Sequence, residues 1–454
     1  MLPLCSACEN SVAGFPSRSS SVGKPAPLAS RKKLKPLQLI VLSRSGQQAK
    51  VTWLRHSDVH RGATASQLEQ VIRSRGSDFD ALLHYHRLQK DFEVQVTAAL
   101  KEMGAKVHVV NRLAYSPSLI SWCDVVIPCG GDGTFLLAAS RIRDSRKPVI
   151  GFNSDPTRSE GRLCLPKWCS RDIRGALTEI REGRFRWLHR SRIRTTLASD
   201  EKLRSAVTGA PLDLHKPILP RYNVTDGAGG DDIATTSYGM EQDNEMWKMN
   251  KDHDMDRNNP PGMVKRVLPY LALNEVFIGE NVSARVSHLQ VKMDGDLRPT
   301  RTKCSGLCVC TGTGSTSWHS HFSINSLRSC TVQELLRLWQ EKKAGESGGV
   351  VGPPPTKEEA KELAAHYNNS LIFPPDDPRL VYSVRELISA DVWPSPKGLK
   401  SRGFTTNVHV KSRCVDAGLV IDGGVSFPFN DGTEATLAVY PQDSLRTVTI
   451  IKNE

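Results

Sequence analysis

Apolar residues follow two different patterns along this chain, and the change between them falls near residue 184. Before that point, short apolar runs predict buried strands at 37–43, 107–110, 124–128 and 148–153. Between the runs, apolar residues recur at helical spacing, and Ser77 and Ser170 are the predicted N-caps of helices over 77–103 and 170–180. Strands that alternate with helices predict an α/β domain with a parallel sheet.

The second half of the chain is predicted to be predominantly β. Strands are predicted at 185–197, 271–278, 286–293, 306–311, 404–410, 417–421 and 445–451. Asp294-Gly295 predicts a hairpin turn, and helices are expected only around 330–342 and 356–368. Two segments without a period, 205–267 and 343–357, are predicted to be long mobile insertions.

These patterns divide the chain into four parts. Residues 1–36 precede the first strand, and residues 37–190 form the α/β domain. Residues 191–441 form a β-rich domain that contains both insertions. Residues 442–454 form a C-terminal strand, which we expect to return to the α/β domain.

Basic residues are concentrated near the N-terminus of a chain whose net charge is +13. Residues 1–36 contain six Lys or Arg and one acid, with many serines and no apolar core. This composition is typical of a mitochondrial transit peptide, although a disordered tail would share most of it. We therefore expect a mitochondrial matrix protein.

Other bulk features restrict the partners. No apolar run approaches the roughly 18 residues that span a bilayer, so we expect no membrane association. The chain contains no recognisable RNA- or DNA-binding motif, and we expect no nucleic acid partner. Its eleven cysteines lack zinc-finger spacing, so we expect free thiols and no protein-bound metal.

The sequence Gly130-Gly131-Asp132-Gly133-Thr134 is the first candidate for chemistry. It lies between an apolar run and a helix-prone run, which predicts a strand, a glycine turn and a helix N-terminus. Glycines let a ligand approach the backbone, and a helix N-terminus favours phosphate. Because a carboxylate there can accept a proton from an alcohol, the turn contains the parts needed for phosphoryl transfer to a hydroxyl.

Three further clusters accompany it. Asn274-Glu275 interrupts an apolar run, and these side chains either meet a ligand or face water at a strand end. The sequence from Thr311 to Trp318 offers small hydroxyl residues and a flat ring after a strand, or else a flexible loop. Asp422-Gly423-Gly424 is by itself more typical of a turn than of a site.

The three motifs Gly-Gly-Asp-Gly-Thr, Asn-Glu and Thr-Gly-Thr-Gly-Ser-Thr-x-aromatic, in this order, resemble the NAD kinases. The similarity is greatest to the mitochondrial branch of animals, in the segments 153–161 and 185–188. Lipid kinases that act on diacylglycerol or sphingosine share only the first motif. The resemblance implies an NAD kinase/diacylglycerol kinase-like α/β nucleotide-binding domain, a β-rich NAD-binding domain, and a substrate cleft between them.

The resemblance also implies roles for individual residues. Asp132 would deprotonate the 2′-hydroxyl of the adenosine ribose of NAD, while Gly130, Gly131 and Gly133 would let phosphates approach. Asn274 would bond the adenine region, and Glu275 would bond the ribose hydroxyls. The remaining implied pocket residues are mostly small or carry hydroxyls: Thr134, Thr313, Gly314, Ser315, Thr316 and Trp318.

Four other residues are further candidates. Arg44 follows the first strand, where it could meet the donor phosphates or simply face solvent, and Asn153 ends a run that matches the family. Ser305 stands where the family commonly has Asp, and Asp422 belongs to the third cluster. The family also commonly has Pro in place of Gly312, Tyr in place of Trp318 and an aromatic residue near Leu165. Because of these differences, the resemblance does not assign the residues that contact the nicotinamide end of NAD.

The predicted function is therefore transfer of the γ-phosphoryl group of ATP to NAD, which yields NADP. We expect Mg²⁺ to accompany ATP and the chain to form a homodimer or larger homo-oligomer. The sequence leaves open whether inorganic polyphosphate can replace ATP as the donor. The alternatives are a lipid kinase and a non-catalytic NAD-binding protein.

Overall fold

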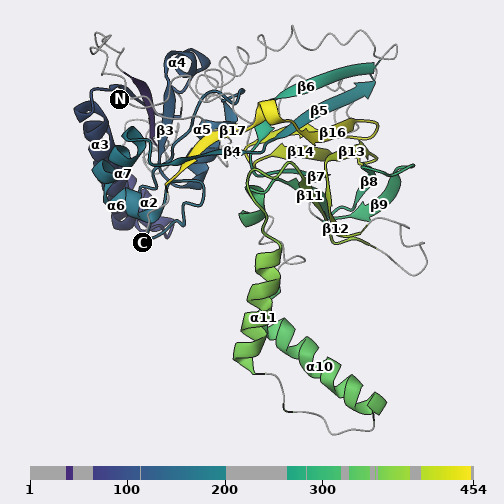
Figure 1. The fold of residues 1–454 in the computed structure, drawn as a ribbon. Helices are drawn as coiled ribbons and strands as arrows, with labels where there is room; N and C mark the ends of the chain where they lie inside the picture. Colours follow the sequence, from purple (N-terminus) through teal and green to yellow (C-terminus); the bar gives the residue numbers. More distant parts are fainter. Residues whose placement is uncertain are drawn as a thin grey trace, which may run out of the picture.

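The computed structural model describes residues 37–43, 65–112, 114–200, 263–282, 284–317, 327–347, 353, 356–388 and 400–450. These residues form an α/β domain, a β-rich domain beside it, and a pair of helices that projects away from both (Figure 1). None of the helices in these ranges has the length and apolar character needed to cross a membrane.

The α/β domain is built on a parallel sheet of three strands in the order β2-β1-β3. They are β1 (Gln38–Ser43), β2 (Lys106–Val110) and β3 (Val125–Cys129). Both faces of the sheet are covered, because parallel strands are usually buried on both sides. The covering helices are α3 (Phe79–Glu102), α4 (Pro117–Trp122), α5 (Asp132–Ser140), α6 (Lys167–Arg171) and α7 (Ile173–Arg181), and α2 (Ala65–Ser74) packs on α3.

The β-rich domain is a sandwich of two six-stranded sheets, in which every strand pair is antiparallel. Buried residues of both sheets, such as Leu437 and Ile278, share one core. The first sheet contains β6 (Met263–Ala272), β5 (Ile193–Asp200), β16 (Glu434–Val439), β13 (Asn407–Ser412), β8 (Ser287–Met293) and β9 (Thr300–Cys304). The second contains β12 (Arg402–Thr405), β11 (Leu380–Arg385), β10 (Gly306–Cys310), β7 (Glu275–Glu280), β14 (Ala417–Ile421) and β15 (Val425–Pro428). The fold class expected from the sequence, α/β followed by β-rich, is therefore confirmed.

A two-stranded sheet joins the domains. The strand β4 (Arg186–Arg190) leads from the α/β domain toward the sandwich and pairs with β17 (Leu445–Thr449), which follows the short helix η4 (Pro441–Asp443). The N–H of Val149 donates to the carbonyl of Arg446 (2.9 Å), and Ile450 packs in the core of the α/β domain. Residues 445–450 are thus part of that domain.

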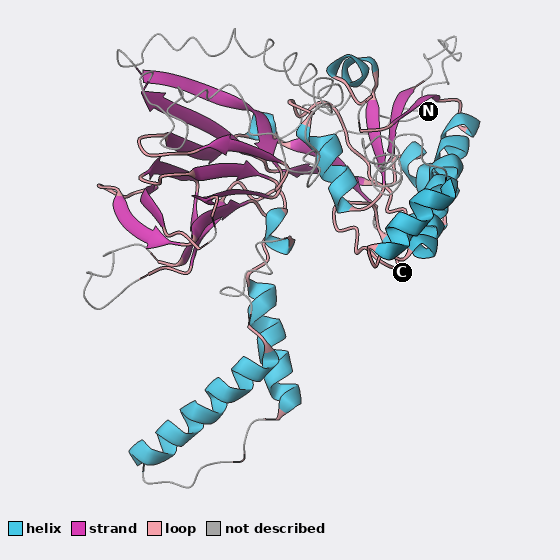
Figure 2. Ribbon diagram, turned by 180° about the vertical axis from the view of Figure 1, so that it is seen from behind, coloured by secondary structure: helices cyan, strands magenta, loops and turns pink. Residues whose placement is uncertain are grey.

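The projecting pair consists of α10 (Ser329–Ser347) and α11 (Lys357–Ser370). Figure 2 shows both helices separated from the sandwich and from the parallel sheet. They meet through a small apolar cluster that includes Val332, Ala360 and Ala364. Beyond α11 the chain returns to the sandwich at Phe373, which packs against Cys310 and Val381.

Several sequence expectations need correction. Ser170 lies inside α6, and the side chain of Asp172 caps the next helix instead, because its carboxylate accepts a hydrogen bond from the N–H of Gly175. The N-cap of α3 is Asp78 rather than the predicted Ser77, so this helix begins at Phe79. Residues 148–153 make only isolated parallel bridges to β3.

The predicted insertions also have different limits. Residues 263–267 belong to β6, and residues 343–347 continue α10, so both insertions are shorter than expected where they meet these elements. The residues 201–262 lie outside the described ranges. The single strand predicted at 271–278 is divided into β6 and β7 by Leu273 and Asn274.

Candidate active site

The glycine turn connects β3 to α5. Gly131 is the N-cap of α5, in an extended conformation, and Asp132 is its first residue. The N–H of Gly130 donates to the carbonyl of Phe152 (2.9 Å). A Cβ on Gly130 would lie 2.3 Å from Oγ1 of the buried Thr134, so position 130 requires glycine. The turn therefore places a carboxylate at a helix N-terminus, at the carboxyl edge of the parallel sheet.

Two backbone donors hold the carboxylate of Asp132. The N–H of Leu163 donates to its Oδ1 (2.9 Å), and the N–H of Arg162 donates to its Oδ2 (3.1 Å). These donors belong to the loop after Asn153, whose buried amide donates to the carbonyl of Ser159 (2.8 Å). Since a carboxylate offers about four lone-pair sites, Asp132 is oriented and can still accept a further hydrogen bond.

Asn274 and Glu275 lie where β6 ends and β7 begins. The N–H groups of Leu273, Asn274 and Glu275 donate to the carboxylate of Asp422, at 2.8, 2.8 and 3.1 Å. Asp422 itself has a positive φ of 48° in the turn after β14. The role of Asp422 is therefore to hold the backbone of this junction from behind.

The side chains of this junction are almost fully buried, with exposed fractions of 4% for Asn274 and 7% for Glu275. The amide of Asn274 donates to Oγ of Ser317 (3.0 Å), but Oδ1 of Asn274 and Oε2 of Glu275 have no hydrogen-bond partner among the described residues. Burial and the neighbouring Asp422 raise the pKa of Glu275 to about 8. Such buried polar atoms indicate a ligand with hydrogen-bonding groups.

The loop 311–317 packs directly on that junction. The N–H of Thr311 donates to the carbonyl of Asn274 (2.9 Å), and its Oγ1 donates to the carbonyl of Leu273 (2.6 Å). The loop continues into the 3₁₀-helix η3 (Gly314–Thr316). A Cβ on Gly314 would lie 2.1 Å from the carbonyl oxygen of Asn274. The second and third motifs thus form one unit, and glycine allows their backbones to touch.

Arg190, at the end of β4, lies between this unit and the glycine turn. Its Nη1 donates to Oγ1 of Thr313 (3.3 Å), and its charge is attracted by the carboxylate of Asp132. Arg190 belongs to none of the three sequence motifs. A single arginine in a strand resembles any surface arginine, and the only available signal was its place at the predicted change from α/β to β.

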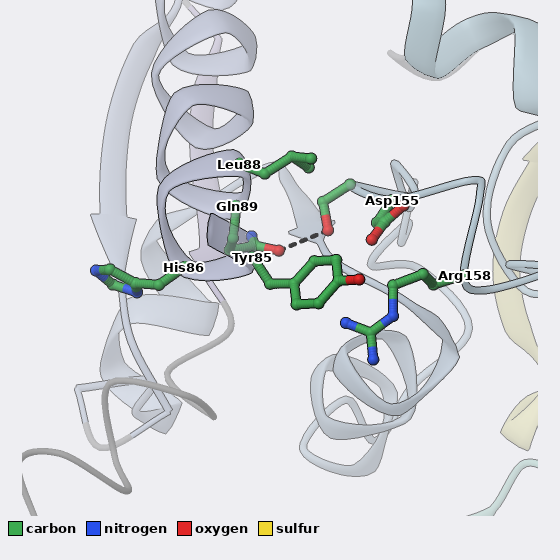
Figure 3. Close-up of a pocket in the computed structure, with 7 residues that line it drawn as sticks. Tyr85, His86, Leu88, Gln89, Asp155 and Arg158 are labelled. Atoms are coloured by element: carbon green, nitrogen blue, oxygen red, sulfur yellow. Dashed lines mark hydrogen bonds between the residues drawn. The ribbon is translucent and has the colours of Figure 1, made fainter. Parts of the chain in front are cut away.

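A shallow pocket opens beside the glycine turn, between α3 and the segment 154–158 (Figure 3). The guanidinium of Arg158 stacks over the ring of Tyr85, with 3.7 Å from Cζ to the ring centroid. Gln89 donates to the carbonyl of Cys129, the last residue of β3 (2.9 Å), and accepts a hydrogen bond from Ser154. His86 points away from this group. The pocket therefore lies at the same sheet edge as Asp132.

Not every sequence candidate lies in this cluster. Ser305 precedes β10, whereas Thr311 follows that strand, so the two lie at opposite ends of it. The hydroxyl of Ser305 donates to Glu386, far from Asp132. Arg44 and Trp318 lie outside the described residues. The described cysteines are free, and these ranges contain no group of three or more His, Cys, Asp or Glu side chains that could hold a metal ion.

Comparisons with known proteins identify a family model and several relatives that match this chain. A family model described as the ATP-NAD kinase N-terminal domain matches residues 66–156. The chain is 36% identical to human "NAD kinase 2, mitochondrial" over 381 residues, which is 84% of this chain and 77% of the relative. It is 34% identical to the protein of the same name from Xenopus tropicalis, over 85% of each chain. A solved structure of yeast NADH kinase complexed with NADH has a TM-score of 0.44 and 13% identity, over 92% of this chain and 85% of that chain.

Proposed function

Because this chain belongs to the NAD kinase family, we propose that it transfers the γ-phosphoryl group of ATP to the 2′-hydroxyl of the adenosine ribose of NAD. The single observation that carries the proposal is the carboxylate of Asp132, which two backbone N–H groups orient at the N-terminus of α5. A carboxylate in that place can take the proton of an alcohol while the helix N-terminus favours the phosphate that approaches it.

In this mechanism the junction and the loop bind NAD, and Asp132 acts on it. The unpartnered Oδ1 of Asn274 would accept a hydrogen bond from the adenine, and the carboxyl of Glu275 would bond the ribose hydroxyls. The 2′-oxygen forms a bond to the γ-phosphorus as the bond from that phosphorus to the β–γ bridging oxygen breaks. The proton passes to Asp132, and ADP and NADP leave.

Mg²⁺ is proposed as a companion of ATP. It would reach the site on the donor phosphates, whose charge it screens, as Mg²⁺ commonly does in phosphoryl transfer. The pocket of Tyr85 and Arg158 lies at the sheet edge beside Asp132, and it is our candidate for the donor side of the site, whether the donor is ATP or polyphosphate. Substitution of Arg158 by Ala should then raise the KM for the donor and leave the KM for NAD unchanged.

The test of the proposed function is NADP formation from Mg-ATP and NAD, with Asp132→Asn beside the wild type. The amide keeps the shape of the side chain but removes the base, so kcat/KM should fall by about 10²–10⁴-fold. NADP is measured with an NADP-specific dehydrogenase. Asp431→Asn, an exposed acid of a surface ion pair, is the matched control and should leave the rate unchanged.

Two outcomes would contradict the proposal. If folded Asp132→Asn makes NADP at the wild-type rate, Asp132 is not the base. If the folded wild type makes no NADP from ATP or from polyphosphate, the proposed NAD kinase reaction is wrong. The next assay is then phosphorylation of diacylglycerol or sphingosine.

We further propose that the protein acts in the mitochondrial matrix as a homodimer or larger homo-oligomer. The composition of residues 1–36 and the names of the animal relatives support the location, and the family resemblance supports the assembly. A fluorescent protein fused after residues 1–36 should enter mitochondria. The molar mass measured by light scattering should correspond to two or more chains. A cytosolic signal or a monomer with full activity would contradict the respective proposal.

A further inference from the structure

Arg190 is a buried cation with few partners. Its exposed fraction is 9%, its Nε has no hydrogen-bond partner, and its bond to Thr313 is long, at 3.3 Å. Among the residues that the structure describes, no carboxylate forms an ion pair with it. The carboxylate of Asp132 attracts it without touching it, and burial lowers the pKa of Arg190 to about 10. A buried charge with so little compensation is costly unless an anion completes its surroundings.

The neighbouring Arg192 shows what a structural arginine looks like at nearly the same place. Its side chain is fully buried, and its Nε donates to the carbonyl of Asp443 (2.6 Å). Its Nη1 donates to the carbonyls of Ala139 and Ile142 at the C-terminal end of α5, where a helix favours a cation. Arg192 therefore holds the two domains together, and Arg190 has no comparable set of acceptors.

The backbone around Arg190 fixes its position. Arg190 pairs with Leu445 of β17. The next residue, Ser191, is tied to the sandwich because its N–H donates to the carbonyl of Pro375 and its hydroxyl donates to the carbonyl of Asp377, both at 2.8 Å. The guanidinium is thus held at the crossing between the domains, between Asp132 on one side and Thr313 on the other.

We propose that Arg190 binds a phosphate group of the substrates with its guanidinium fork, next to the 2′-hydroxyl that Asp132 deprotonates. The inference rests on the proposed function for the identity of the substrates. A planar guanidinium with free N–H groups matches phosphate oxygens. The phosphate is either the phosphoryl group in transfer, whose negative charge the arginine would stabilise, or the diphosphate of NAD.

The first experiment measures thermal unfolding with and without inorganic pyrophosphate, a probe that does not depend on catalysis. Pyrophosphate should raise the melting temperature of the wild type and of Arg186→Met, the control at the exposed first residue of the same strand. It should not raise that of Arg190→Met. Without pyrophosphate, Arg190→Met should be at least as stable as the wild type, because it removes an uncompensated buried charge, whereas Arg192→Met should be clearly less stable.

Kinetics then separate the two phosphates. If Arg190 binds the phosphoryl group in transfer, Arg190→Met should lower kcat at least tenfold with little change in either KM. If it binds the diphosphate of NAD, the KM for NAD should rise instead. Either result supports the proposal, since both place a phosphate on Arg190.

Other results would overturn it. The first is that pyrophosphate leaves the melting temperature of the wild type unchanged. The second is that Arg190→Met is destabilised like Arg192→Met, while pyrophosphate still raises its melting temperature and its kinetics are those of the wild type. If Arg190→Met does not fold, Arg190→Lys tests the guanidinium group instead, because lysine keeps the charge but not the paired N–H donors. Pyrophosphate should then raise the melting temperature of Arg190→Lys much less than that of the wild type. If the wild type binds pyrophosphate through Arg190 but makes no NADP, the proposed reaction fails while phosphate binding by Arg190 stands.

Discussion

At the residue scale, three acids of the site differ in chemistry because they differ in partners. Asp132 is partly exposed and accepts two backbone hydrogen bonds. Asp422 accepts three, which oppose the effect of burial, although its pKa is still raised to about 6. Glu275 is buried among Asp422, Cys308 and Cys310, and its Oε2 has no partner among the described residues. The first is suited to accept a proton, the second to hold backbone, and the third to meet a ligand.

Glu275 should make the free energy of unfolding depend on pH. Its pKa is about 8 in the folded protein and about 4.5 in the unfolded chain, so the folded state retains the proton over this window. The contribution of Glu275 to stability therefore decreases as pH rises from about 4.5 to about 8, by at most about 1.4 kcal/mol per pH unit.

Glu275→Gln removes this dependence. Urea unfolding should find the variant close to the wild type at pH 5 and more stable than it at pH 8, by about 1–3 kcal/mol. Asp416→Asn is the control, because Asp416 is a partly exposed acid of the same sandwich that accepts a hydrogen bond from Asn281. Parallel pH profiles for the wild type and Glu275→Gln would contradict the assignment.

At the scale of elements, the site depends on where the segment after α10 and α11 packs on the sandwich. After α11, the N–H of Phe373 donates to Oγ of Ser315 (3.3 Å), and the carbonyl of Pro374 lies against Gly312. This contact gives a physical reason for glycine where the family commonly has Pro. The returning segment occupies the space that a side chain at position 312 would need, and it forms one wall of the loop 311–317.

Gly312→Ala should therefore distort the loop. Its Cβ would lie 1.7 Å from the carbonyl oxygen of Pro374, which is backbone and cannot turn aside. We expect a loss of about 1–3 kcal/mol in the free energy of unfolding, together with a higher KM for NAD. The control Gly424→Ala meets only ordinary contacts at 3.9 Å and should be close to neutral. A Gly312→Ala variant with wild-type stability and KM would show that the loop adapts.

At the scale of the whole molecule, the two domains are joined close to the reactive carboxylate. The helix α5 carries Asp132 at its first residue, and Arg192 binds the carbonyls of its C-terminal end. Arg192 also binds the carbonyl of Asp443, whose carboxylate forms two hydrogen bonds with Arg194 of β5, at 2.6 and 2.7 Å. A shift between the domains would therefore move Asp132 relative to Asn274 and Glu275.

Asp443→Asn tests this connection. The substitution leaves Arg194 without its carboxylate, and because Asp443 is buried while Arg194 is partly exposed, we expect a loss of about 2–3 kcal/mol in urea unfolding. A fall in kcat should accompany it. Asp431→Asn, which breaks the exposed pair with Arg413, should change stability by less than about 0.5 kcal/mol. Equal effects of the two substitutions would mean that the carboxylate pair of Asp443 with Arg194 does not stabilise this connection.

The local elements and the order of the motifs follow from the amino-acid sequence alone. Helical and strand periodicity placed β1, α3 and β3, as well as the turn at Gly130–Gly133, because burial on one face or on both faces imposes a repeat that adjacent residues display. The three motifs indicate the NAD kinase family, because each motif consists of adjacent residues and can be recognised without the fold. The errors in helix caps and insertion limits arose at boundaries, where the repeat ends and single side chains decide.

Which residues of different elements meet depends instead on how the folded chain packs. Asn274 and Asp422 are 148 positions apart, and Arg190 and Thr313 are 123 apart, so no periodic pattern relates them. The fold gave Asp422 a supporting role, placed Ser305 at the far end of β10, and brought Arg190 beside Asp132. Such contacts follow from the packing of two domains around one crossing, which is a property of the folded chain as a whole rather than of any segment.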